Sequence, residues 1–288
     1  MIIDFHTHIF PSFFRKERGP YFNEEPGFDL LYRSPKSKMA GRKDLIASMD
    51  QEGIDRSVVF GFPWRKADYY KRHNDYIIES VQEYPERLTG FCCFDPMSRE
   101  ASNEVERCLD AGLKGVGELA FYYPDLTADA MDALNDVMAV CLQRNAPILI
   151  HASEPMGHQY PGKQTMALNH IYDLIGRHPL NKIILGHWGG GLFFYNLMKR
   201  DVREAIANVW FDTAASPYIY IPDIYRIAAE IIGSDRILFG SDYPLLRPGR
   251  YFKEMEATGL SPEILIHFKG MNAAAILGIN THDYVHAT

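Results

Sequence analysis

The sequence predicts an α/β protein built as a (β/α)8 TIM barrel, and three observations support this fold. Short β-branched, apolar runs alternate along the chain with longer charged segments of helical periodicity. Eight such runs are present, which is the number that a closed barrel of this type needs. Several of them, such as VVFGF and ILIHA, are apolar at nearly every position, as expected of parallel strands with both faces covered.

The predicted elements follow one another in the order that βαβ units require. The predicted strands are residues 2–6, 56–61, 88–94, 115–119, 148–151, 183–187, 209–213 and 237–241. The clearest helical segments between them are 42–52, 74–84, 100–111, 128–144 and 164–177. We therefore expect one domain over residues 1–280, followed by a C-terminal tail of residues 281–288.

One connection is much longer than the others. Residues 10–40, after the first strand, are rich in aromatic, proline and charged residues, and we expect a long loop there. Active sites of these barrels lie at the carboxyl ends of the strands, so the loop is expected to act as a lid or to contact substrate. Exposed aromatic side chains in it would form a lid or a homodimer contact: Phe13, Phe14, Tyr21 and Phe22.

Composition excludes several classes of protein. The formal net charge is -7, which argues against non-specific binding to nucleic acid or to anionic membranes. No run approaches the length of a membrane span, and the N-terminus lacks the pattern of a signal peptide. The four cysteines form no CxxC pair, so we expect reduced thiols in a cytoplasmic protein. Walker, GxGxxG and GxSxG motifs are absent from the sequence.

The first candidate site is DFHTH at the end of the first predicted strand. Alternation along a strand places Asp4, His6 and His8 on the same side. Two imidazoles so placed can bind one divalent cation, and Asp4 is expected to orient one of them. Alone, an HxH pair is a weak signal.

Polar residues at the ends of other predicted strands strengthen the case for a metal site. His151 ends ILIHA, His187 ends IILGH, and Asp242 follows ILFGS. Each closes an apolar run before a turn, so in a barrel all three converge with the HxH pair on one pocket. Because buried polar groups need partners and a cation supplies one, the set predicts a metal site.

These motifs resemble the amidohydrolase superfamily, and more narrowly its amidohydrolase-2 branch of aminocarboxymuconate-semialdehyde decarboxylase-like proteins. The resemblance rests on DFHTH, IHA, LGHWGG and GSDYP in this order, with NAAAILG near the end, and so covers nearly the whole chain. It implies that His6, His8 and His151 bind metal, and that Asp242 is a further ligand or the base. It implies that His187 is a ligand of a second metal or a general acid/base.

Glu118 departs from the common pattern of the superfamily. Many members carry a carboxylated lysine on the fourth strand to bridge two metals, but Lys114 precedes the expected strand end, whereas Glu118 lies at it. Glu118 is therefore expected to bridge a second metal, to contact substrate, or to form an ion pair at the rim. We expect one or two divalent ions, with zinc first and manganese or iron as alternatives.

Four further residues are candidates for substrate binding. Trp188 follows His187, and Tyr243 and Arg247 follow Asp242, so all three are expected near the pocket mouth. Arg33, in the long loop, suits bidentate contact with a substrate carboxylate.

The leading hypothesis is a metal-dependent hydrolase that cleaves an amide, lactone or ester of a small molecule with metal-activated water. The alternative is a metal-dependent decarboxylase of a small unsaturated or aromatic carboxylic acid, in which His187 and Asp242 handle the proton at carbon. A loop arginine such as Arg33 would favour decarboxylation, and a second metal on Glu118 would disfavour it. A third hypothesis is a metal-binding module without catalysis.

Overall fold

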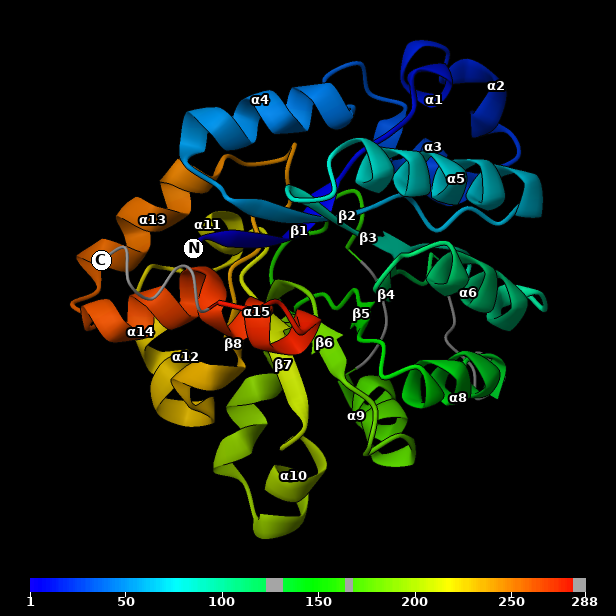
Figure 1. The fold of residues 1–288 in the computed structure, drawn as a ribbon. Helices are drawn as coiled ribbons and strands as arrows, with labels where there is room; N and C mark the ends of the chain where they lie inside the picture. Colours follow the sequence, from blue (N-terminus) through cyan, green and yellow to red (C-terminus); the bar gives the residue numbers. More distant parts are fainter. Residues whose placement is uncertain (123–131, 164–167, 282–288) are drawn as a thin grey trace.

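The computed structural model describes residues 1–122, 132–163 and 168–281. Eight parallel strands form one sheet in sequence order, and helices surround it, as Figure 1 shows. The strands are β1 (Ile3–His8), β2 (Arg56–Phe60), β3 (Leu88–Cys92), β4 (Gly115–Leu119), β5 (Ile148–Ile150), β6 (Ile183–Leu185), β7 (Val209–Asp212) and β8 (Ile237–Leu238). The predicted (β/α)8 barrel is therefore confirmed, with every strand at its expected place.

Hydrogen bonds between the first and last strands close the barrel. The amide of Phe5 donates to the carbonyl oxygen of Phe239 at 2.8 Å, and that of His8 donates to Tyr243 at 2.8 Å. A parallel bridge also joins Thr7 to Tyr243. The loop after β8 is thereby fixed beside the end of β1.

Helices alternate with the strands, as predicted, and three more follow β8. They are α4 (Arg42–Glu52), α5 (Ala67–Glu83), α6 (Ala101–Asp110), α8 (Asn135–Gln143), α9 (Leu168–Arg177), α10 (Arg200–Ala205), α11 (Ser216–Ile219), α12 (Ile224–Ile232), α13 (Pro248–Ala257), α14 (Pro262–Ile266) and α15 (Asn272–Leu277). Parts of the predicted helices 128–144 and 164–177 lie outside the described residues. None of the helices in the described ranges is both long and apolar enough to cross a membrane.

Two apolar layers hold the barrel together. Side chains inside it, such as Phe5, Val58 and Phe91, form one buried cluster, to which Ala274 of α15 also belongs. Since α15 contacts β1 and β8, it covers the amino-terminal end of the barrel. A larger cluster fills the space between strands and surrounding helices. The carboxyl-terminal end remains for the polar strand-end residues.

The long segment after β1, which the sequence predicts as a loop, has some helical structure. It contains three short helices, α1 (Ser12–Lys16), α2 (Gly19–Phe22) and α3 (Pro26–Tyr32), which lie beside α5 in Figure 1. The expectation of exposed aromatics is also wrong in part, because Phe14 is fully buried against Trp64. Phe13, Tyr21 and Phe22 are half-buried against the same core. The division into a domain of residues 1–280 and a tail of 281–288 stays a prediction, since residues 282–288 lie outside the described chain.

Candidate metal centre

Six side chains meet at the carboxyl-terminal end of the barrel. Each lies at a strand end or in the loop that follows the strand, and parallel strands bring such positions together. They are His6, His8, Glu118, His151, His187 and Asp242. All the metal ligands predicted from the sequence are thus neighbours in the folded chain.

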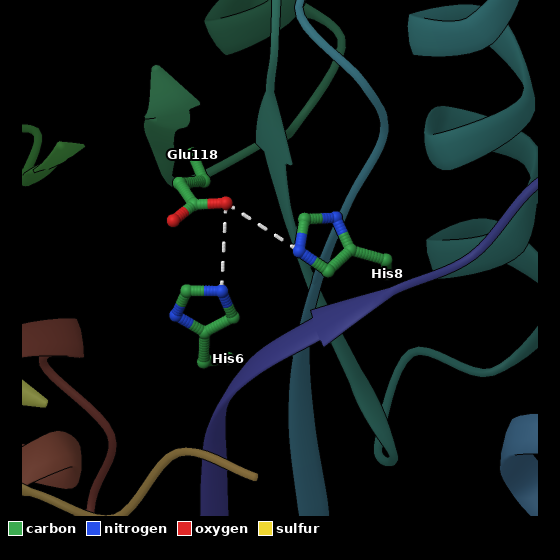
Figure 2. Close-up of side chains that lie close together, drawn as sticks. All are labelled: His6, His8 and Glu118. Carbon is green, nitrogen blue, oxygen red and sulfur yellow. Dashed lines mark ion pairs between the residues drawn. The ribbon is translucent and has the colours of Figure 1, made fainter. Parts of the chain in front are cut away.

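Glu118 lies at the middle of this cluster. Its Oε2 is 3.6 Å from Nε2 of His6 and 3.5 Å from Nε2 of His8, the contacts drawn in Figure 2. Its Oε1 is 2.8 Å from Nδ1 of His151 and 3.2 Å from Nε2 of His187. One carboxylate therefore joins two groups of donors, each with the composition and spacing of a metal site.

Asp242 completes the first group. Its Oδ1 lies 3.8 Å from Nε2 of His6 and 3.5 Å from Nε2 of His8. The backbone holds this position, because the amide of Asp242 donates to the carbonyl oxygen of His6 at 2.9 Å. The aspartate sits in the left-handed region, with φ of 58°, and its carbonyl oxygen accepts from the amide of Leu245 at 2.7 Å in a tight turn.

Contacts of Nδ1, on the side of the ring away from the cluster, fix the orientation of three histidines. Nδ1 of His8 is 3.1 Å from the carbonyl oxygen of Gly61, and Nδ1 of His187 is 3.1 Å from that of Ala214. A carbonyl only accepts, so Nδ1 carries the proton in both and Nε2 faces the cluster. Nδ1 of His6 is 2.7 Å from Oδ2 of Asp212, and its Nε2 also faces the cluster.

The orienting carboxylate belongs to Asp212, not to Asp4. Asp212, at the end of β7, is fully buried, and its Oδ1 also accepts from the amide of His187 at 2.8 Å. Asp4 instead accepts from the amide and hydroxyl of Ser241 at 2.8 and 2.5 Å. The predicted role of Asp4 is wrong because the register of β1 shifts between Asp4 and Thr7, which breaks simple alternation. Asp212 had a signal in the sequence, since it is the polar residue that closes the run VWFD.

The cluster has strong internal electrostatics. Burial alone would raise the pKa of Glu118, but the charges of His6 and His151 hold it well below its ordinary value. Burial would lower the pKa of His8, yet hydrogen bonds to Asp242 and Glu118 raise it to about 9. The carboxylates are thus kept ionised in a buried place, as ligands of a cation must be.

One unpaired atom shows that the donor set suits a cation. Nε2 of His6 is fully buried and has no hydrogen-bond partner among the described residues. A buried polar atom without a partner is costly, and this one points at the carboxylates of Glu118 and Asp242. A divalent cation among these imidazole nitrogens and carboxylate oxygens would satisfy it.

The residues predicted to bind substrate lie elsewhere. Arg33 is mostly exposed and its Nε is 2.5 Å from Oδ1 of Asp29. Arg247 is also exposed and donates to Oε1 of Gln51 at 2.9 Å. The loop arginine that would have favoured decarboxylation therefore does not reach the cluster.

The two aromatic candidates also have other partners. Trp188 is fully buried, and its indole nitrogen donates to Oγ of Ser216 at 2.8 Å. The hydroxyl of Tyr243 donates to the carbonyl oxygen of Asp44 at 3.2 Å, on the outer side of the loop after β8. Neither polar group is directed at the six clustered side chains.

Known proteins resemble the chain in sequence and in fold. The family model described as Amidohydrolase matches residues 3–279. The chain is similar to gamma-resorcylate decarboxylase from Polaromonas sp. strain JS666, with 26% identity over 252 residues, covering 69% of this chain and 76% of the relative.

Solved structures share the fold. 5-Carboxyvanillate decarboxylase from Sphingomonas paucimobilis has a TM-score of 0.77 and 17% identity, over 97% of this chain and 99% of that one. The dihydroxybenzoic acid decarboxylase of Polaromonas sp. JS666, with bound manganese and 2-nitroresorcinol, has a TM-score of 0.69 and 21% identity over 99% of both chains. At these identities the likeness concerns the fold alone.

The prediction of a hydrolase is wrong in the light of these comparisons. The similar proteins are decarboxylases of aromatic acids, which break a carbon–carbon bond, and not hydrolases of amides, lactones or esters. The donor residues alone could not have distinguished the two reactions, because the same ligand set serves both. A zinc ion gains no support either, since the metal in the related solved structures is manganese.

Proposed function

The chain belongs to the amidohydrolase family, and on that premise we propose that it is a metal-dependent decarboxylase of a small aromatic carboxylic acid. The observation that carries the proposal is the convergence of six donor side chains around one unpaired imidazole nitrogen, Nε2 of His6. The similarity to gamma-resorcylate decarboxylase supports the type of reaction.

We assign the cation to His6, His8, Glu118 and Asp242. Nε2 of each histidine lies 3.5–3.8 Å from one oxygen of each carboxylate. When bound, a divalent cation supplies a Lewis-acidic charge that offsets the negative charge of an acid substrate. Manganese is the first choice, because solved structures of similar fold contain it. Glu118, His151 and His187 form a second group of donors, but a cation there would take the place of a proton on Nε2 of His187, so the proposal uses one cation.

The reaction itself needs a proton. Cleavage of the bond between ring and carboxylate releases CO2, and the electron pair left on the ring carbon must take up a proton. We assign this proton to Nε2 of His187. Burial would lower the pKa of His187, but its hydrogen bond to Glu118 and the nearby carboxylate charge raise it, which favours a protonated ring.

The chain also excludes competing water. Glu118, His6 and His187 are buried, while His8, His151 and Asp242 keep a small exposed fraction of 13–15%. The exposed edge is the side from which a substrate can enter.

CO2 release is the direct test. Protein loaded with manganese would be incubated with 2,6-dihydroxybenzoate, 5-carboxyvanillate and a set of related aromatic acids. We expect release with at least one of them, and loss of release in Asp242→Asn. The matched control is Asp201→Asn, because Asp201 is an exposed aspartate of α10 outside the centre. Binding without CO2 release from any acid would contradict the proposal and support a binding module.

A further inference from the structure

Three aromatic side chains from separate segments lie together at the carboxyl-terminal end of the barrel. Tyr32 ends α3, Phe62 follows β2, and Tyr122 follows β4. The rings of Phe62 and Tyr122 stack with centroids 5.6 Å apart and planes at 11°. Tyr32 meets Phe62 edge-on, at 6.0 Å and 78°. These three residues are called the aromatic trio below.

The aromatic trio borders the metal centre. Phe62 directly follows Gly61, whose carbonyl oxygen is 3.1 Å from Nδ1 of His8. Tyr122 comes four residues after Glu118 on the same strand and its loop. Burial raises the pKa of Tyr32 and Tyr122, and the charges of Asp242 and Glu118 raise both further.

Both phenols lack a hydrogen-bond partner among the described residues. Tyr32 and Tyr122 are half-buried, and burial raises the pKa of each hydroxyl, so both keep their protons. Across the part of the chain that the structure describes, neither hydroxyl makes a hydrogen bond, in contrast with Tyr251, which donates to Ser241 at 2.7 Å. Two O–H donors beside the centre are therefore available to a ligand.

The segment that carries Tyr32 is held firmly. The carboxylate of Glu25, which is buried, accepts from the amides of Arg65 and Lys66, both at 2.9 Å. A methyl group added at Gly27 of α3 would lie 2.6 Å from Cδ2 of Tyr122, so the helix packs closely on that ring. The positions of the two phenols are thus set before substrate arrives, which favours selective binding.

We propose that Tyr32 and Tyr122 donate hydrogen bonds to oxygen substituents on the ring of the substrate, so that the enzyme selects aromatic acids bearing hydroxyl or methoxy groups. This rests on the proposed function, since it concerns the same site. Phe62 packs against the ring of Tyr122 on one side and meets Tyr32 on the other, and keeps the two phenols in place.

Binding of 2-nitroresorcinol to the manganese-loaded protein tests the proposal. Isothermal titration would compare the wild type with Tyr32→Phe and Tyr122→Phe. Each substitution removes one hydrogen bond and leaves the ring, so at least one should weaken binding about tenfold. The control is Tyr69→Phe, because the hydroxyl of Tyr69 bonds to Glu24 at the surface.

A second ligand separates recognition from a structural effect. In 2,6-dimethylnitrobenzene, methyl groups replace the two hydroxyls of 2-nitroresorcinol. We expect the substitutions to leave its binding unchanged. Equal weakening of both ligands, unchanged binding of 2-nitroresorcinol in both variants, or no binding of it by the wild type would overturn the inference. Because turnover is not measured, these outcomes are distinct from a failure of the proposed decarboxylation.

Discussion

Two fully buried histidines, His6 in the metal centre and His73 in α5, have opposite surroundings. Nδ1 of His73 accepts from the indole nitrogen of Trp64 at 2.9 Å, and its Nε2 donates to the carbonyl oxygen of Ile9 at 2.7 Å. In His6 only Nδ1 is paired, with Asp212, and Nε2 has no partner in the described chain. The two rings are therefore equally buried, and they differ in whether Nε2 has a hydrogen-bond partner.

The pKa values of the two histidines are shifted in opposite directions. Burial lowers the pKa of His73 to about 3, and the charge of His8 acts in the same direction. Burial also acts against the charge on His6, but the carboxylates of Asp212 and Glu118 raise its pKa well above the ordinary value. His73, whose two nitrogens are paired with uncharged groups, is therefore part of the scaffold, whereas His6 directs its unpaired nitrogen at two carboxylates of the metal centre.

The largest expected effect is on catalysis and follows from substitutions in the metal centre. His6→Ala and Asp242→Asn should each lower CO2 release on the order of a thousandfold, because a cation ligand is lost. The thermal midpoint of metal-free Asp242→Asn should change little, whereas that of His6→Ala should fall, because Oδ2 of the buried Asp212 loses its partner. Steady-state rates and thermal unfolding check both points, and near-wild-type turnover in either variant would show that the donors are assigned wrongly.

His73→Leu should have the reverse outcome. The substitution leaves the indole nitrogen of Trp64 and the carbonyl oxygen of Ile9 unpaired in the core, which should cost about 2–4 kcal/mol of unfolding free energy. Urea unfolding measures this loss. Manganese stoichiometry should stay at the wild-type value. His158→Leu is the control, since His158 is exposed, and an equal loss there would remove the distinction.

Removal of metal should affect the two regions unequally. A ligand present at a hundred times its Kd stabilises the folded state by about 2.7 kcal/mol. Manganese should therefore raise the thermal midpoint of wild-type protein and of His73→Leu, but hardly that of His6→Ala. Calorimetry with and without a chelator gives the comparison. A full manganese shift in His6→Ala would place the cation elsewhere.

The smallest effect concerns pH. The pKa of His73 falls from 6.5 to about 3 on folding, so between these values the unfolded chain holds a proton that the folded chain lacks. The unfolding free energy should thus fall with falling pH, with His73 contributing about 1.4 kcal/mol per unit. His73→Gln should show a slope smaller by this amount in urea unfolding at pH 6 and pH 5. Equal slopes would mean that His73 is already protonated in the folded state.

Much of the fold and the centre was predictable because both depend on local patterns. Apolar runs mark buried parallel strands, and the polar residues that close them, such as His151 and His187, fall at one end of the barrel. The roles of Asp4 and Asp212 were not predictable, since a register shift in β1 decides which carboxylate reaches His6.

The surroundings of the centre were less predictable still. The contact of Tyr32 with Phe62 depends on how α3 folds back over the barrel, which no local periodicity encodes. Arg33, one residue later, looked equally suitable and faces outward toward Asp29. The type of reaction could not be predicted from the ligands, because hydrolases and decarboxylases can share them.

CO2 release from 2,6-dihydroxybenzoate during titration of metal-free protein with manganese tests the central claim most directly. If the strand-end donors hold a cation on which decarboxylation depends, release should be absent without metal and rise with occupancy, reaching its maximum at one ion per chain. Asp242→Asn should stay inactive throughout. Full release by metal-free protein, or none from this or any other aromatic acid at full occupancy, would contradict the account.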